Sequence, residues 1–228
     1  MIPIGDDARR RARVPFVTYA LIAANVAVFV RELNVPDPDR FIDAFATIPY
    51  DVTHDVVLPS PSPPIALLTI VTAMFVHGGL LHVGFNMLFL FVFGPAVESR
   101  CGHAGFLALY LLCGIAGGAA QIAVEPGSHV PEIGASGAIA GVLGAYLVTY
   151  PFASIRTIVP IGCFPLFLRL PALLVIGVWA AVQFVTGFGS IGERAAESHG
   201  GTAYFAHIGG FCAGVIVIGV FSRWGGAR

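Results

Sequence analysis

The sequence predicts an all-α polytopic membrane protein with six transmembrane helices and with both termini on the cytoplasmic side. Of its 228 residues, 57% are hydrophobic and only 11% are charged, whereas a soluble domain carries roughly 25% charged residues. Six apolar runs approach the roughly 20 residues that a membrane span needs. This composition excludes a soluble globular protein and a disordered chain, and the formal net charge of −1 argues against a nucleic-acid-binding protein.

The six apolar runs carry no formal charge. They cover residues 14–30, 80–97, 104–124, 133–155, 170–192 and 203–222. The second run belongs to a longer apolar stretch that the helix-breaking pair Gly78-Gly79 divides. Residues 65–76 therefore become an approach segment at the membrane interface.

The orientation follows from the arginines, which are the only basic residues other than histidine. With the N-terminus in the cytoplasm, nine of the twelve arginines lie inside, as the positive-inside rule requires. Residues 1–13 and 223–228 are then cytoplasmic tails, and residues 14–222 form a single membrane domain. Two external loops stand out, a long one at 31–64 and a glycine-rich one at 187–202 that we expect to be a mobile flap.

Two connections have local patterns of their own. In the long external loop, Phe41, Ile42 and Phe45 follow Asp37 at helical spacing, which predicts a short amphipathic helix. On the cytoplasmic side, Pro160, Pro165 and Pro171 are expected to break the link between the fourth and fifth spans.

The predicted spans contain no Asp or Glu. This excludes an intramembrane aspartyl protease and disfavours a carboxylate-based proton transporter. An HExxH zinc-protease helix is absent from the sequence. The four cysteines (Cys101, Cys113, Cys163 and Cys212) form no close pair, so we expect neither a disulfide framework nor a zinc site, and no metal or cofactor.

Polar residues recur at one depth in three spans that run from the outside inwards. His82 and Asn86 share a face of the second span, Ser136 opens the fourth, and His207 lies near the start of the sixth. At 1.5 Å rise per residue, all lie within roughly 10 Å of the outer boundary. Ser136 as nucleophile would need a base, which His207 can supply, and the oxyanion would need donors from His82, Asn86 and the Ser136 amide.

Glycines would bring the two reactive residues together. The fourth span carries Gly137 and Gly141, and the sixth carries Gly210 and Gly214, at the spacing of small-residue helix contacts. Gly134 precedes the serine and leaves room for close approach of a neighbouring backbone.

Taken singly, each polar residue also has a packing explanation. A serine in a helix can bond to its own backbone, and a lone histidine can tie two helices together. Gln183 and Trp179 in the fifth span are interpreted as packing residues. A small channel using His82, Asn86 and His207 is a further alternative, although no polar residue continues the path across the membrane.

Four sequence elements resemble the rhomboid family of intramembrane serine proteases, in the family's order. They are HGGLLHVGFN at 77–86, GPAVESRCG at 94–102, GASG at 134–137 and AHIGGFCAG at 206–214. The resemblance extends over all six spans. It implies a rhomboid-like bundle in which Ser136 and His207 form a catalytic dyad, with His82, Asn86 and the Ser136 amide as the oxyanion hole.

The resemblance also implies how a substrate would be handled. Transmembrane proteins would be cleaved near their outer ends, through an acyl-enzyme, without metal or cofactor. The fifth span would lean aside to admit them, with Trp179 and Phe184 as candidate gate residues and the 187–202 loop as a cap. Many family members place an aromatic one turn after the serine, where this chain has Ala140.

Two further expectations concern identity and location. A catalytically silent relative that only binds transmembrane helices is the alternative to a protease. The absence of lysine and the short tails are typical of a multi-pass protein of a bacterial plasma membrane, in contact with membrane lipid.

Overall fold

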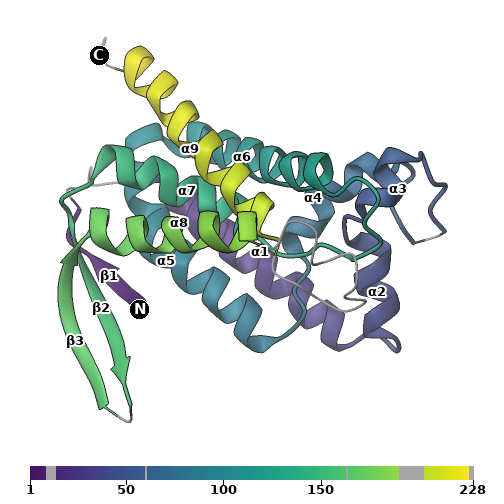
Figure 1. The fold of residues 1–228 in the computed structure, drawn as a ribbon, viewed down its shortest axis with the longest axis horizontal. Coiled ribbons are helices and arrows are strands. Elements are labelled where there is room, and N and C mark those ends of the chain that lie inside the picture. Colours follow the sequence, from purple (N-terminus) through teal and green to yellow (C-terminus); the bar gives the residue numbers. More distant parts are fainter. Residues whose placement is uncertain (9–13, 60, 163, 190–202, 226–228) are drawn as a thin grey trace.

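The computed structural model describes residues 1–8, 14–59, 61–162, 164–189 and 203–225. Helices run side by side along the long axis of the molecule, and a small sheet lies at one end (Figure 1). The main helices are α1 (Phe16–Leu33), α5 (Leu80–Cys101), α6 (His103–Val124), α7 (Ser136–Thr149), α8 (Ala172–Gly189) and α9 (Tyr204–Gly225). The protein is therefore mostly helical, as predicted.

Each main helix overlaps one predicted span. Among the described residues, α1, α5, α6 and α8 are long and apolar enough to cross a membrane, and α7 and residues 204–220 of α9 are shorter apolar helices. The largest departure is α7, which ends at Thr149 rather than at residue 155. The reason is local, because Pro151 follows and disfavours helical backbone in the residue before it.

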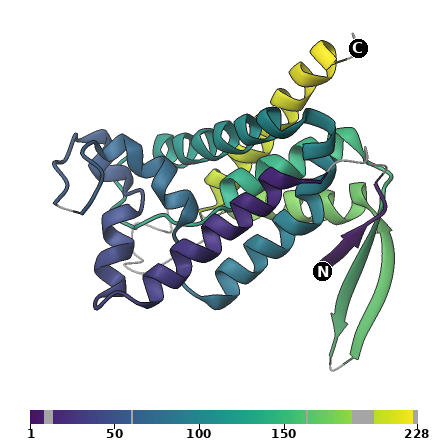
Figure 2. The ribbon, with the colours of Figure 1, turned by 180° about the vertical axis from the view of Figure 1, so that it is seen from behind.

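Short helices connect α1 to α5 at the end of the bundle opposite the sheet (Figure 2). They are α2 (Pro38–Phe45), α3 (Pro49–Thr53), η1 (Ala66–Leu68), α4 (Thr69–Thr72) and η2 (Ala73–Phe75). The helix α2 confirms the amphipathic helix predicted after Asp37, whose side chain accepts a hydrogen bond from the Arg40 amide at 3.0 Å.

The sheet is an addition that the sequence did not predict. Strands β1 (Ile2–Asp6), β2 (Ser154–Ile161) and β3 (Phe164–Pro171) form an antiparallel sheet in the order β1-β2-β3. The link expected to be broken by prolines is thus a hairpin, in which Pro160 and Pro165 pair next to the turn. The hydroxyl of Tyr146 in α7 donates to Asp6 at 2.8 Å and ties β1 to the bundle.

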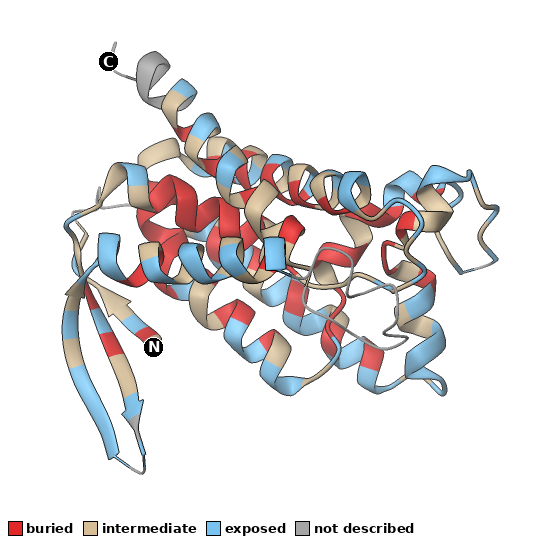
Figure 3. Cartoon of the chain, in the orientation of Figure 1, coloured by how far each residue is buried: buried red, intermediate tan, exposed pale blue. Residues whose placement is uncertain are grey.

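The core lies where α5, α6 and α7 meet. Buried residues cluster along these helices (Figure 3), and the rings of Phe93 and Tyr146 meet edge to face with centroids 5.0 Å apart. Between α5 and α6, Gly102 has a φ of +77°, a left-handed conformation that favours glycine and lets the chain reverse within one residue.

Two buried carboxylates lie in the main helices, just beyond the ends of the predicted spans. Glu32 lies in α1, because this helix continues to Leu33, beyond the predicted end at residue 30. Glu98 lies in α5, and its carboxylate accepts hydrogen bonds from the amides of Val17 and Thr18 at 2.9 and 2.8 Å. A carboxylate at a helix N-terminus is favourable, so Glu98 fixes the start of α1 against the end of α5.

Candidate active site

Ser136 is the first residue of α7 and is half-buried. The preceding loop is held in place by main-chain hydrogen bonds, including Gly134 N to Ala73 O at 2.8 Å and a pair between Thr47 and Glu132. Gly134 has a φ of +114°, which an L side chain rarely adopts. The serine therefore lies at the positive end of the α7 dipole, at a position that the backbone defines tightly.

His207 lies in the first turn of α9 and faces Ser136. Its ring Nε2 is 2.7 Å from the Ser136 Oγ. The two helices pack backbone to backbone, since a Cβ on Gly210 or Gly214 would collide with the carbonyl oxygen of Gly137 or Gly141 respectively. Four glycines thus allow the separation at which a serine hydroxyl can donate a hydrogen bond to a histidine ring.

The start of α9 is capped by a buried amide from α6. Oε1 of Gln121 accepts hydrogen bonds from the amides of Phe205 and Ala206 at 3.0 and 3.2 Å. These amides belong to the first turn of the helix, whose donors have no partner within the helix. Gln121, which the sequence did not single out, therefore fixes the turn that carries His207.

The far side of the His207 ring contacts α8. Oε1 of Gln183 lies 2.7 Å from Nδ1 of His207, and the ring of Trp179 lies 5.9 Å from the histidine ring, centroid to centroid. Both residues were predicted to be packing residues, although a buried amide in an apolar helix is itself a signal of a polar partner. The position one turn after the serine holds Ala140, which has no ring, and the aromatic neighbour of His207 is Trp179 of α8 instead.

The predicted oxyanion-hole residues lie on α5 beside Gly134. The amide nitrogen of Asn86 donates to the His82 carbonyl at 3.1 Å. A Cβ on Gly134 would lie 2.7 Å from Nε2 of His82 and 3.8 Å from Nδ2 of Asn86. Both nitrogens therefore lie beside the loop that leads into Ser136.

His77 anchors the approach to α5, outside the spans. Its amide donates to Oε2 of Glu32 at 3.2 Å, and its ring meets that of His82 edge to face, with centroids 5.0 Å apart. Burial, and to a smaller extent the neighbouring His82, lowers the pKa of His77 to about 4. The ring is therefore neutral at pH 7 and acts through shape and hydrogen bonding rather than charge.

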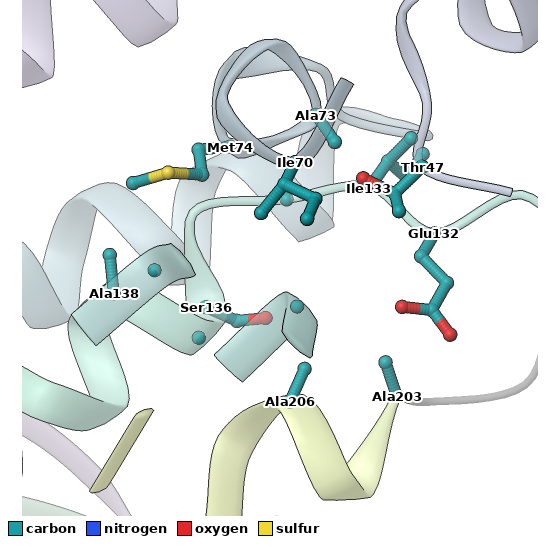
Figure 4. A pocket seen from close by; sticks show the side chains of 14 residues that line it. Thr47, Ile70, Ala73, Met74, Glu132, Ile133, Ser136, Ala138, Ala203 and Ala206 are labelled. Carbon is teal, nitrogen blue, oxygen red and sulfur yellow. The ribbon is translucent and has the colours of Figure 1, made fainter. Parts of the chain in front are cut away.

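A cavity of about 40 Å³ opens beside Ser136. Ser136 and Ala206 line it on one side and Thr47 and Glu132 on another (Figure 4). Small residues make up much of the wall, so the space suits a group of the size of a methyl or hydroxymethyl side chain.

The remaining predicted residues belong to α8 and to the segment that follows it. Phe184 is half-buried on α8, and its ring stacks on Phe188 with centroids 6.4 Å apart. Of the predicted flap at 187–202, residues 190–202 lie outside the described part of the chain. Within the described residues, no group of three or more His, Cys, Asp or Glu side chains could hold a metal ion.

Fold and site together define a multi-pass membrane protein with a serine–histidine pair between α7 and α9. The chain matches the Rhomboid domain over residues 65–224 and belongs to the rhomboid family.

Curated relatives extend this assignment. Rhomboid protein 1, mitochondrial, of Saccharomyces cerevisiae is 29% identical over 204 residues, which cover 88% of this chain and 51% of that protein. The putative rhomboid protease YdcA of Bacillus subtilis is 41% identical over 78 residues, 34% of this chain and 39% of that protein. The rhomboid protease GluP of the same organism is 44% identical over 78 residues, 34% of this chain and 15% of that protein. The chain thus spans about half the length of these relatives or less.

Proposed function

We propose that the chain is an intramembrane serine endopeptidase that cleaves transmembrane segments near the outer membrane face. Ser136 is the nucleophile and His207 the general base and acid. The observation that carries this proposal is the 2.7 Å separation between Ser136 Oγ and His207 Nε2 in a half-buried site. Relatives named as rhomboid proteases support it at the level of the family.

Ser136 and His207 act both when the acyl-enzyme forms and when water cleaves it. His207 takes the hydroxyl proton while Oγ attacks the scissile carbonyl carbon, and the carbonyl oxygen becomes an oxyanion. His82, Asn86 and the Ser136 amide donate hydrogen bonds to that oxygen. The C–N bond then breaks as His207 returns the proton to the leaving amine, and water cleaves the acyl-enzyme by the same route.

The substrate is a membrane helix that unwinds at the cut. An intact helix hides its carbonyls in its own hydrogen bonds, so the segment must open before Ser136 can attack. The small cavity beside the serine favours a small side chain there. Six spans with cytoplasmic termini, in a bacterial plasma membrane, complete the proposed arrangement.

Fluorophosphonate labelling, beside cleavage of a transmembrane substrate in liposomes, tests the proposal. We expect the wild type to be labelled and to cleave, whereas Ser136→Ala and His207→Ala lose at least about a thousandfold in rate. Full cleavage by Ser136→Ala would overturn the proposal. A wild type that binds a transmembrane helix without cleaving it would instead favour a catalytically silent binding protein.

A further inference from the structure

We propose that Gln183 is a positioning residue that selects the ring tautomer in which His207 can accept a proton, an inference that rests on the proposed function. Nδ1 of His207 lies 2.7 Å from Oε1 of Gln183, and Nε2 of the same ring lies 2.7 Å from Oγ of Ser136. A neutral imidazole has one N–H, so one nitrogen donates and the other accepts. Because a carbonyl oxygen only accepts, the proton lies on Nδ1 and the lone pair of Nε2 faces the hydroxyl.

The opposite arrangement would disable the base. If the Gln183 NH2 group faced Nδ1, the ring proton would lie on Nε2, and the Ser136 hydroxyl could no longer donate to it. A carboxylate would select the same tautomer as the amide oxygen, but it would add a charge within an apolar helix. Glutamine therefore supplies the acceptor without that cost.

Imidazole ¹⁵N NMR and fluorophosphonate labelling of Gln183→Met and Gln183→Glu test this role. We expect the Nδ1–H tautomer of His207 in the wild type and a shift towards Nε2–H in Gln183→Met, with labelling slower by about tenfold or more. Gln183→Glu keeps an acceptor oxygen, so it should recover most of the rate. Val182→Met, at an exposed neighbour on α8, controls for a new methionine on this helix.

The outcomes separate this proposal from the proposed function. Suppose that Gln183→Met is labelled at the wild-type rate and keeps the wild-type histidine spectrum, while Ser136→Ala is not labelled. This result would overturn the role of Gln183 and leave the protease assignment intact. A slow Gln183→Glu with the wild-type tautomer would also overturn it. Labelling or cleavage by Ser136→Ala would instead remove the protease assignment.

A different observation carries a second inference, on the hairpin of β2 and β3. We infer that this hairpin is a docking surface for anionic phospholipid headgroups at the membrane. It projects sideways from the end of the bundle, across the direction of α8 (Figure 1). β3 is an edge strand, and its aromatic residues Phe164 and Phe167 are 79% and 66% exposed.

The hairpin carries two adjacent arginines whose positive charges an external anion would neutralise. Arg156 and Arg169 lie directly opposite each other on the two strands, and both are exposed. Like charges in this position repel, and no carboxylate among the described residues forms an ion pair with either arginine. Two residues closer to the turn, Ile158 lies opposite Phe167 on the same face of the sheet, so apolar side chains lie beside the arginines.

The surface around the hairpin points to lipid rather than to a protein. The hairpin leads directly into α8, one of the helices long and apolar enough to span a membrane. Exposed Leu173 and Leu174 begin that helix, and Phe152 before the hairpin is 81% exposed. An apolar surface that continues onto a lipid-facing helix and carries two arginines matches the boundary between acyl chains and phosphates.

Photo-crosslinking in liposomes tests the lipid surface. With p-benzoylphenylalanine in place of Phe167, we expect lipid adducts whose yield increases severalfold when phosphatidylglycerol is added to phosphatidylcholine. The reason is that each of the two arginines attracts the anionic headgroups. The double change Arg156→Gln and Arg169→Gln should remove this preference, and Arg40→Gln at the other end of the bundle should not. The same probe at Val57, which is 92% exposed, gives the background yield. The inference would be overturned by a lipid-adduct yield at Phe167 no higher than this background. It would also be overturned by a yield that does not respond to phosphatidylglycerol, or by crosslinked dimers in place of lipid adducts.

Discussion

The helices α7 and α9 pack tightly against each other, whereas α8 packs more loosely against the bundle. Gly210 and Gly214 place α9 so close to α7 that a single added Cβ would collide with backbone. On α8, by contrast, a Cβ at Gly177 would meet nothing within 4 Å, and residues such as Val182 and Val185 are exposed. Ser136 and His207 thus lie on the tightly packed pair, whereas Gln183, the second hydrogen-bond partner of His207, lies on the more loosely packed helix.

The largest effect is expected from breaking the rigid pair. Gly210→Ala drives a methyl group into the Gly137 carbonyl, so we expect a loss of at least about 3 kcal/mol in the free energy of unfolding and little labelling of Ser136. Gly177→Ala is the matched control on α8 and should be neutral or stabilising by up to about 1 kcal/mol, because alanine favours a helix. Unfolding in mixed micelles measures both. Equal losses in the two variants would contradict the contrast between the helices.

An intermediate effect is expected from the cap of α9. Gln121→Leu leaves the amides of Phe205 and Ala206 without their acceptor, which should cost about 1–3 kcal/mol and slow fluorophosphonate labelling. Gln121→Glu retains an acceptor oxygen at the positive end of α9 and should lose less. Equal stability of Gln121→Leu and the wild type in thermal unfolding would show that the cap does not hold this turn.

The smallest effect on stability is expected on the loosely packed helix α8. Phe184→Ala removes a half-buried ring of α8 and should change the free energy of unfolding by about 1 kcal/mol or less. If α8 admits the substrate, cleavage of a transmembrane segment should change severalfold while labelling by a small fluorophosphonate stays constant. Val185→Ala, at a 75% exposed position, is the control. A parallel change in labelling and cleavage would argue against a gate at Phe184.

Apolar runs and glycine spacing predicted the main helices, because both are local properties of the chain. The sheet could not be predicted in this way, since β1 pairs with residues some 150 positions further along, and the prolines near the turn suggested an irregular link. Gln121 and Gln183 could not be assigned either. Both are single amides in apolar helices, and the rotation of each helix decides whether an amide faces lipid, a helix end or a histidine.

The length of α7 has a consequence for where a membrane helix would be cut. With 14 residues, α7 extends about 21 Å, against a hydrocarbon thickness of about 30 Å. On the proposed function, with the C-terminal end of α7 at the inner boundary, Ser136 lies below the outer boundary by the difference between these two lengths. The site of cleavage would then stay at a constant distance from the inner boundary, and a thicker bilayer would place it deeper below the outer surface.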